Sequence, residues 1–297
     1  METESVTGFG WQGIGISVPA SWELGAHHGA RDEGYACLDD GREMRLQVRW
    51  TRPKRKAADL EGLLRRYQRS LAKASKGTVH FDRLDPETLS ERLREEKMVA
   101  PFAWRSNRDA HGLVSYCRGC GRMVLMEILF PAGEADHSLA RRIMGSMTDH
   151  SNDGWALWSV YGFAFSVPAS YNLAQADLAP GRLRFLFRSA RRSWLRVERW
   201  ALASQWMEKA ALDAWPEELL KLMRVSRRGP VEKNEGSFRE HRAVRFAATV
   251  TGRGFLRRDK VAGVLWHCPE EDKAFVVMAA GGHDGLPDEV ADTVKVP

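Results

Sequence analysis

Two cysteines in the middle of the chain offer the clearest metal chemistry. Cys117 and Cys120 have the C-x-x-C spacing within the turn-forming sequence Cys-Arg-Gly-Cys-Gly. Thiolates at this spacing supply half of a tetrahedral zinc site, and they can also serve redox or catalytic chemistry. A third interpretation is packing, because free cysteine behaves as a small apolar residue. No second C-x-x-C exists, so Cys37, Cys268 or a histidine would have to complete a zinc site.

Comparison of the two halves of the chain favours packing for Cys117. The segment 112–117 (GLVSYC) aligns with 263–268 (GVLWHC), so Cys117 has a counterpart in Cys268. Cys120 has none, because Glu271 stands in its place. A thiol that occupies the same strand end in both halves is most simply a buried residue beneath a hairpin.

A second group of residues could bind anions. Arginines alternate with leucine and phenylalanine along residues 182–188 and continue into the following turn, which places the cations on one face of a β-hairpin. They are Arg182, Arg184, Arg188, Arg191 and Arg192. A basic ribbon can follow a phosphate backbone, and Trp194 and Trp200 could stack on bases. The chain carries 45 basic and 39 acidic residues, a net charge of only +6, so nucleic acid is the weaker alternative.

Enzyme signatures are absent. The chain contains no G-x-x-x-x-G-K-[ST], G-x-S-x-G or H-E-x-x-H motif. Residues 8–13 (GFGWQG) have the glycine spacing of a dinucleotide-binding loop, but a strand-like segment ending at Pro19 follows where a helix is required. No catalytic or cofactor-binding residue is therefore predicted, and a non-enzymatic role is favoured.

An internal repeat organises the chain. Residues 13–24 (GIGISVPASWEL) return almost unchanged as residues 162–173 (GFAFSVPASYNL), which indicates a tandem duplication. We predict two domains, 1–150 and 151–297. Further along, residues 46–50 align with 195–200 if one extra residue is allowed before the final tryptophan.

The same pattern of elements is expected in both halves. Alternating apolar residues on either side of Asp39-Asp40-Gly41 predict a β-hairpin, and apolar residues at helical spacing from Leu60 to Leu71 predict an amphipathic helix. Further helices are expected at 86–97, 138–147, 205–225 with a break near Pro216, and 287–295. Consecutive hairpins make the sheets antiparallel, so the predicted fold class is α+β, with two repeats that each consist of an antiparallel sheet flanked by helices.

This organisation resembles the PsbP-like family of α/β/α sandwiches. The resemblance covers both halves and depends on the order of elements, on the short closing helix, and on the motif V-P-x-x-W/Y-x-L at Val18 to Leu24 and Val167 to Leu173. It implies a role as an extrinsic subunit, an assembly factor or a partner of small GTPases. It brings no catalytic residues, because the family shares no catalytic motif.

Composition completes the expectations about function. No apolar stretch is long enough to span a bilayer and the N-terminus lacks the features of a signal peptide, so a cytoplasmic protein with four free thiols is expected. The favoured hypothesis is a non-enzymatic binding or assembly protein that acts on a protein partner. The alternatives are binding to nucleic acid or another anionic surface, and a small-molecule or metal site between the repeats. No cofactor is expected unless Cys117 and Cys120 hold zinc.

Overall fold

The structure is a computed structural model that describes residues 5–53, 59–75, 78–151, 153–190, 193–223, 226–251 and 259–295. The chain forms two compact units, Met1–Ala164 and Phe165–Pro297, here called unit 1 and unit 2. The division predicted at residues 150 and 151 follows the sequence repeat, whereas the compact units divide between Ala164 and Phe165. No helix among the described residues is long and apolar enough to cross a bilayer.

A small antiparallel sheet begins unit 1. Its strands β1 (Val6–Trp11) and β2 (Ile14–Pro19) form a hairpin, and β10 (Trp155–Val160) pairs with the other edge of β1. Gln12 and Gly13 both have positive φ angles, as a two-residue type I′ turn requires. The boundary between the units falls within β11 (Phe163–Pro168), which follows β10 after a turn of the same kind. The repeated sequence motif therefore starts at a tight hairpin turn.

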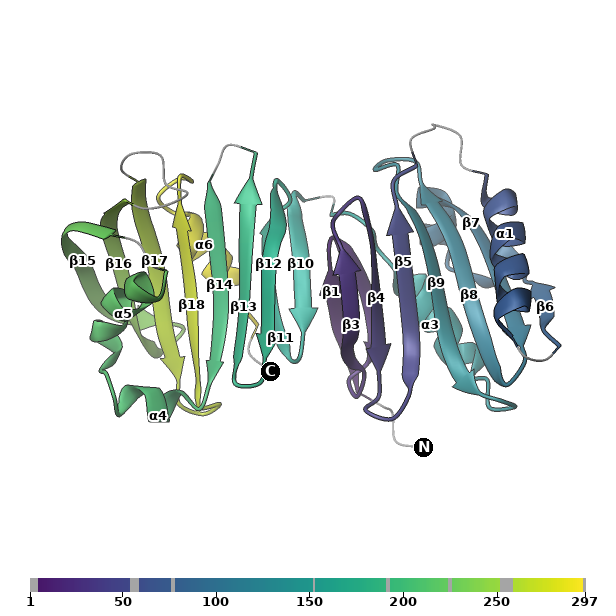
Figure 1. The fold of residues 1–297 in the computed structure, drawn as a ribbon, viewed down its shortest axis with the longest axis horizontal. Coiled ribbons are helices and arrows are strands. Elements are labelled where there is room, and N and C mark those ends of the chain that lie inside the picture. The colour runs from purple at the N-terminus through teal and green to yellow at the C-terminus, as the bar shows by residue number, and fades with distance from the viewer. Residues whose placement is uncertain are drawn as a thin grey trace. The chain divides into compact units, whose positions relative to one another are not determined.

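Unit 1 also contains a seven-stranded antiparallel sheet (Figure 1). Its strands, in spatial order, are β3 (Glu23–Gly29), β4 (Glu33–Asp39), β5 (Met44–Thr51), β9 (Met123–Pro131), β8 (Arg108–Cys117), β7 (Lys97–Arg105) and β6 (His80–Arg83). Its helices are α1 (Leu60–Ala74), the short 3-10 helix η1 (Pro86–Thr88), the short α-helix α2 (Glu91–Glu96), and α3 (His137–Ser146). Helix α1 packs Leu60 and Leu64 against Phe102 and Val114 on one face of the sheet.

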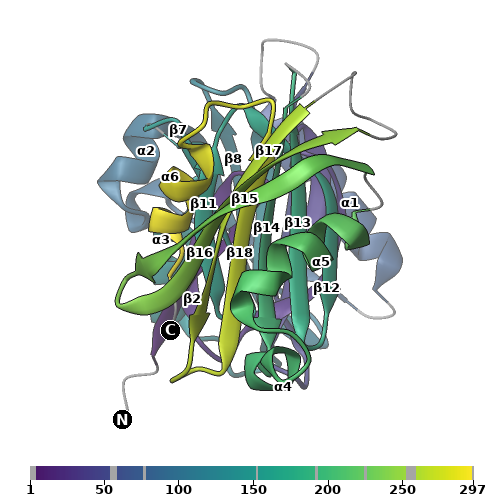
Figure 2. The ribbon, with the colours of Figure 1, turned by 90° about the vertical axis from the view of Figure 1, so that its left-hand side faces the viewer.

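Unit 2 has a seven-stranded sheet with the same strand order. Its strands are β12 (Tyr171–Ala179), β13 (Arg182–Ser189), β14 (Trp194–Ala201), β18 (Lys273–Ala280), β17 (Asp259–Cys268), β16 (His241–Thr251) and β15 (Ser226–Phe238). Its helices are α4 (Ala203–Met207), η2 (Leu212–Ala214), α5 (Trp215–Leu222) and α6 (Leu286–Thr293). Figure 2 shows α4 and α5 on one face of this sheet and α6 on the other. The α5 face buries Trp215 and Leu219 against Val244 and Val276.

The predicted fold class is wrong. Strand is the dominant secondary structure, arranged in three antiparallel sheets, and the chain is not a pair of helix-flanked α+β sandwiches. The strands expected at 102–105 and 113–117 extend over 97–105 and 108–117, and the region expected as helix 86–97 contains only η1 and α2 before β7 begins at Lys97. Charged and polar residues within these strands concealed their length, because one face of an antiparallel strand can meet solvent.

Two glycines fix a common register for the large sheets. Gly112 on β8 lies beneath the ring of Phe102, and Gly263 on β17 lies beneath the ring of Phe246. A Cβ atom at either glycine would overlap the ring, so the same packing device occurs at the same place in both units. Residues of the two sheets can therefore be matched by counting from these glycines.

This register shows that Trp50 and Trp200, which the sequence alignment matches, do not occupy equivalent positions. Trp50 pairs with Val124 and Trp200 pairs with Ala274, and neither pairing contains a bulge. When positions are counted across the paired strands from Gly112 and Gly263, Trp50 and Trp200 are offset by one residue. Because neighbouring residues of a strand point to opposite faces, the two tryptophans lie on opposite faces of their sheets. Trp200 accordingly belongs to the core beneath α5. The extra residue expected in the second half does not exist.

Candidate functional site

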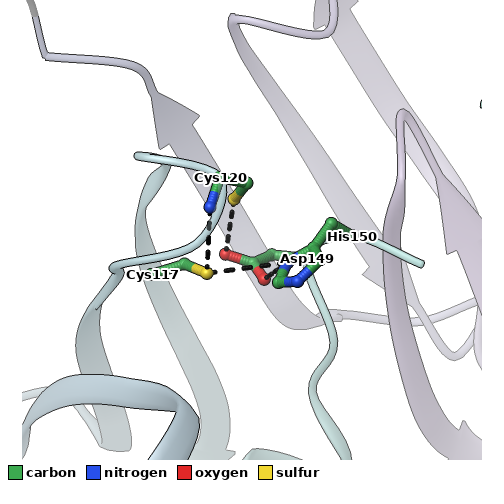
Figure 3. Close-up of side chains that lie close together, drawn as sticks. All are labelled: Cys117, Cys120, Asp149 and His150. Atoms are coloured by element: carbon green, nitrogen blue, oxygen red, sulfur yellow. Dashed lines mark hydrogen bonds and ion pairs between the residues drawn. The ribbon is translucent and has the colours of Figure 1, made fainter. Parts of the chain in front are cut away.

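The two cysteines of the C-x-x-C motif lie at the turn between β8 and β9 (Figure 3). Cys117 ends β8 and is buried, and Cys120 is half-buried within the turn. The backbone N–H of Cys117 donates to the carbonyl of Arg122 (2.9 Å), and Gly121 N–H donates to the carbonyl of Cys117 (2.9 Å). Gly121 has φ of 70°, a conformation that glycine adopts without strain. The turn therefore presents both sulfur atoms on one side.

A second segment brings an acid and an imidazole to the cysteines. Thr148 follows α3 and exchanges two backbone hydrogen bonds with Gly15 of β2, at 3.0 and 2.8 Å. These bonds hold the next two residues, Asp149 and His150, beside the β8–β9 turn. Sequence patterning does not single them out, because 29 residues separate Asp149 from Cys120. The only signal was an acid next to a histidine directly after the closing helix.

The four side chains form a compact cluster. One potential ligand atom from each of Cys117, Cys120, Asp149 and His150 lies within 4.8 Å of all the others. The Sγ atom of Cys117 is 3.5 Å from Nδ1 of His150, and the Cys120 thiol donates to Oδ2 of Asp149 at 3.5 Å. The Oδ1 atom of Asp149 is 2.9 Å from the same Nδ1. The site thus combines sulfur, nitrogen and oxygen donors.

Two cations surround the cluster. Lys97 forms an ion pair with Oδ1 of Asp149, and both side chains are only 1% exposed. The guanidinium of Arg122 donates to three backbone carbonyls, those of Asp149 (2.8 Å), Gln12 (3.1 Å) and Arg31 (2.7 Å). Arg122 therefore fastens the turn and the Asp149 segment to the rest of unit 1.

Burial and charge act differently on the acid and the thiol. Burial alone would raise the pKa of Asp149, but the bonds to Lys97 and His150 outweigh it and lower that pKa below its usual value. Burial, reinforced by the charge of Asp149, raises the pKa of Cys120 to about 11. A thiol with a raised pKa is a poor nucleophile while no metal ion is bound to it.

Unit 2 carries a smaller cluster at the matching turn. Cys268 ends β17 as Cys117 ends β8, and His241 and Glu270 lie within reach of it. The Cys268 thiol donates to Oε2 of Glu270 (3.3 Å), which is 3.7 Å from Nδ1 of His241. The Glu270 side chain is 71% exposed, and Glu271 pairs with Lys273 instead. This cluster contains one thiol and a solvent-exposed acid.

The arginine hairpin of unit 2 is largely neutralised. Arg182 donates from Nε and Nη2 to Glu198 (2.9 and 2.7 Å), and Arg184 pairs with Asp177 (2.8 Å). Arg196 is buried and also pairs with Glu198. Arg188 is exposed, whereas Arg191 and Arg192 lie outside the described residues. The alternation of arginine with buried apolar residues is as expected, but Arg182 and Arg184 do not form a free anion-binding surface.

A large groove in unit 1 lies between α1 and the open part of its sheet. It has a volume of about 1060 Å³ and contains residues from the β3–β4 turn, β4, β5, β9 and one side of α1. Helix α1 packs over β7 and β8 (Figure 1). One side of α1 lines the groove, and residues of β4, β5 and β9 line the rest of it. Sequence reasoning did not identify this groove, because its residues come from four separate segments.

The groove combines arginine with aromatic side chains. The guanidinium of Arg49 lies 5.6 Å from the ring centre of Tyr35, and the His28 ring stacks on the same tyrosine at 5.3 Å. Arg66 enters from α1. Among the residues that the structure describes, neither arginine has a carboxylate within ion-pair distance. Burial and a hydrogen bond to Cys37 raise the pKa of Tyr35 to about 12, so its phenol stays neutral.

A buried acid lies beneath the wall of the groove. Glu127 on β9 accepts hydrogen bonds from Gln47 (2.5 Å), from the indole of Trp104 (2.8 Å) and from the phenol of Tyr67. Burial, together with the charge of Glu127, raises the pKa of Tyr67. These bonds fix Tyr67 in the groove wall as a neutral donor.

Comparisons with known proteins give no family. No protein-family model matches the chain, and no curated protein matches it. Two of the similar solved structures align with nearly the whole chain. The apo structure of the immunity protein TplEi of the T6SS from Pseudomonas aeruginosa is 11% identical over 98% of this chain and 96% of that one, with a TM-score of 0.34. A chain of the Tle4-Tli4 complex is 10% identical over 100% of this chain and 99% of that one, with a TM-score of 0.36. At such TM-scores the two structures carry no argument about function.

Proposed function

We propose that this protein is a binding protein that recognises an acidic segment of a protein partner in the α1 groove of unit 1. The observation that supports the proposal is the pair of arginines, Arg49 and Arg66, that line an open groove without an acidic partner among the described residues. An unpaired guanidinium next to an aromatic ring attracts a carboxylate strongly, because it can donate two parallel hydrogen bonds. No step in this role requires catalysis.

The composition of the groove favours a protein partner. Tyrosine and arginine are the residue types that most often dominate binding energy at protein interfaces. Tyr35 is already ordered by His28 and Arg49, so little side-chain entropy is lost when a partner binds. Apolar floor residues such as Leu125 supply area for a partner side chain, and Glu33 on the rim offers a site for a partner cation.

Nucleic acid fits the groove less well. Binding to a phosphate backbone requires several cations along a continuous track. This groove has two arginines and a carboxylate of its own, Glu33. In unit 2, Arg182 and Arg184 are paired with acids of the same chain. The nucleic-acid alternative is therefore an outcome to be tested rather than a second proposal.

The proposal can be tested with a random peptide library selected on the full-length chain. We expect the selected peptides to be rich in Asp and Glu, and their affinity should be measured by fluorescence anisotropy. Arg49→Ala should weaken binding by roughly 10- to 150-fold, the value of a charge-assisted hydrogen bond in an interface. Arg49 is exposed, so the melting temperature should not change.

Arg69→Ala provides the matched control. Arg69 is an exposed arginine on the same helix and does not line the groove. It should leave peptide affinity unchanged. Failure to select any acidic peptide, or equal losses in Arg49→Ala and Arg69→Ala, would refute the proposal. Salt-sensitive binding of short RNA or DNA that Arg49→Ala abolishes would assign the groove to nucleic acid instead.

A further inference from the structure

We infer that Cys117, Cys120, Asp149 and His150 bind one zinc ion in unit 1 (Figure 3). The set contains two sulfur donors, one imidazole nitrogen and one carboxylate oxygen. Zinc accepts this mixture in tetrahedral sites, whereas calcium and magnesium prefer oxygen ligands alone. Four protein ligands leave no open position, so the ion has a structural role.

The spacing of the donor atoms fits a tetrahedron. Bonds of about 2.3 Å to sulfur and about 2.0–2.1 Å to nitrogen or oxygen place neighbouring ligands of a tetrahedral zinc ion roughly 3.3–3.8 Å apart. The Cys117 Sγ to His150 Nδ1 distance is 3.5 Å, and the Cys120 Sγ to Asp149 Oδ2 distance is 3.5 Å. Two edges of the tetrahedron are therefore already formed, one between each cysteine and one residue of the second segment.

The charges around the cluster are opposite in sign and similar in number. Two thiolates and one carboxylate carry three negative charges, and a divalent ion together with the side chains of Lys97 and Arg122 supplies four positive ones. Lys97 binds Oδ1 of Asp149, which leaves Oδ2 on the side of Cys120. Lys97 is thus a positioning residue that orients the carboxylate, as partners of metal ligands commonly do.

The surroundings support a preformed site with access from solvent. Arg122 and the Gly15–Thr148 backbone bonds hold the turn and the second segment in place before any ion binds. The His150 side chain is 31% exposed, so an ion can enter from that side. The ion would join the β8–β9 turn to the segment after α3.

The second half of the chain lacks most of the ligands. The closing helices α3 and α6 end at Ser146 and Thr293, so Asp149 and His150 correspond by position to Val296 and Pro297 in the sequence. Neither valine nor proline can bind a metal through its side chain. Only Cys268 is shared with the unit 1 set, and it provides the natural control.

Metal analysis of the purified, reduced full-length chain tests the inference. We expect one zinc ion per chain by elemental analysis, removal by a chelator, and stoichiometric rebinding when zinc sulfate is added. Cobalt chloride added to the metal-free chain should give the visible bands of tetrahedral Co²⁺ and the near-ultraviolet band of thiolate ligation. These cobalt spectra use the wild-type chain, so they do not depend on how well a variant folds.

Variants then assign the ligands. Cys117→Ser and Cys120→Ser should each weaken zinc binding by about 100-fold or more, and His150→Gln should weaken it by roughly 10- to 100-fold. Cys268→Ser and Cys37→Ser should retain one zinc ion. Circular dichroism of the metal-free variants checks that they are folded.

Three results would overturn the inference. The first is a reduced wild-type chain that binds neither zinc nor cobalt. The second is equal loss of metal in Cys268→Ser and Cys117→Ser. The third is a Cys117–Cys120 disulfide that forms in air after the reduced chain has been saturated with zinc, because zinc-bound thiolates should resist this oxidation and its occurrence would assign the pair to redox chemistry.

Discussion

The β8–β9 turn of unit 1 and the β17–β18 turn of unit 2 occupy the same place in sheets of the same strand order. They nevertheless contact different neighbouring segments of the chain. The first turn contacts Asp149 and His150 through its cysteines, and Arg122 secures that contact. The second turn accepts hydrogen bonds from the start of α4: Ala203 and Ser204 donate to the carbonyl and carboxylate of Asp272. The scaffold is common, and the turn residues decide which neighbouring segment is fixed.

A second contrast lies on the open faces of the two sheets. Counted from Gly112 and Gly263, Arg49 of β5 and Glu198 of β14 occupy the same position. Glu198 is fully buried and binds Arg182 and Arg196, whereas Arg49 is exposed in the α1 groove. At this position a carboxylate belongs to a buried ionic network in unit 2, whereas a guanidinium is exposed in the groove of unit 1. The affinity loss predicted for Arg49→Ala tests this contrast directly.

The largest effect on stability is expected when the buried Lys97–Asp149 ion pair is broken. In the metal-free chain, Lys97→Met leaves the carboxylate of Asp149 buried without its cation, which should lower the free energy of unfolding by about 3–5 kcal/mol. Urea denaturation measures the loss. Lys273→Met is the control in unit 2, because the Lys273–Glu271 pair lies near the surface and should contribute under about 1 kcal/mol. Equal losses would show that the two turns are energetically alike.

Substitution of the two equivalent glycines, Gly112 and Gly263, should reduce stability by similar amounts. Gly112→Ala and Gly263→Ala each place a Cβ atom against a phenylalanine ring, so each should destabilise the chain by roughly 1–3 kcal/mol. Thermal unfolding monitored by circular dichroism measures both. Adding Phe102→Leu to Gly112→Ala should restore part of the loss by making room. If only one of the two substitutions lowered stability, the glycine–phenylalanine packing would not be equivalent in the two units.

The smallest effect concerns the β4–β5 turn. Asp40 accepts backbone hydrogen bonds from Glu43 and Arg42 and a side-chain bond from Arg45, which lower its pKa from 3.8 to about 2. A lowered pKa in the folded state stabilises the fold above about pH 4, and this contribution disappears as pH falls towards 2. Asp40→Asn should therefore cost under about 1 kcal/mol at neutral pH, because the carboxylate is near solvent. The difference from wild type should shrink as pH falls through about 2 and vanish below it.

The matching turn of unit 2 provides the comparison for this last prediction. There Ser189 and Ser193 close the β13–β14 connection by hydrogen bonds that involve no carboxylate among the described residues. Ser193→Ala should have an effect on unfolding that does not change between pH 2 and pH 6. A pH-dependent effect at Ser193, or none at Asp40, would contradict the assignment.

Local patterns in the sequence predicted the hairpins and α1 well. Asp-Gly turns and apolar residues at regular spacing depend on near neighbours, and they located β4, β5 and the apolar face of Leu60 to Leu71. Strand β15 was missed, because Gly229 and Pro230 are typical of a helix end or a loop. Proline is tolerated there, since β15 is an edge strand with a bulge between Arg228 and Glu232.

The candidate sites were harder to predict, because they depend on long-range pairing. Cys117 and Cys120 were visible as a motif, but Asp149 and His150 reach them only through the Gly15–Thr148 contact. The pairing of arginines in the unit 2 hairpin likewise required the positions of Asp177 and Glu198 on neighbouring strands. The sequence alignment also matched Trp50 with Trp200, whereas strand pairing offsets the two tryptophans by one position, and local composition cannot correct such a register.

The pairing of β1 with β10 affects the order of events during synthesis. Ser159 on β10 donates to the carbonyl of Gly8 on β1, 151 residues earlier in the chain. A ribosome that adds roughly 5–20 residues per second needs roughly 8–30 s to deliver this partner strand. Throughout that time one edge of β1 has unpaired backbone groups, which are prone to pair with other chains. A chain that stops at residue 150 would keep this edge exposed, whereas a chain that continues through β10 covers it.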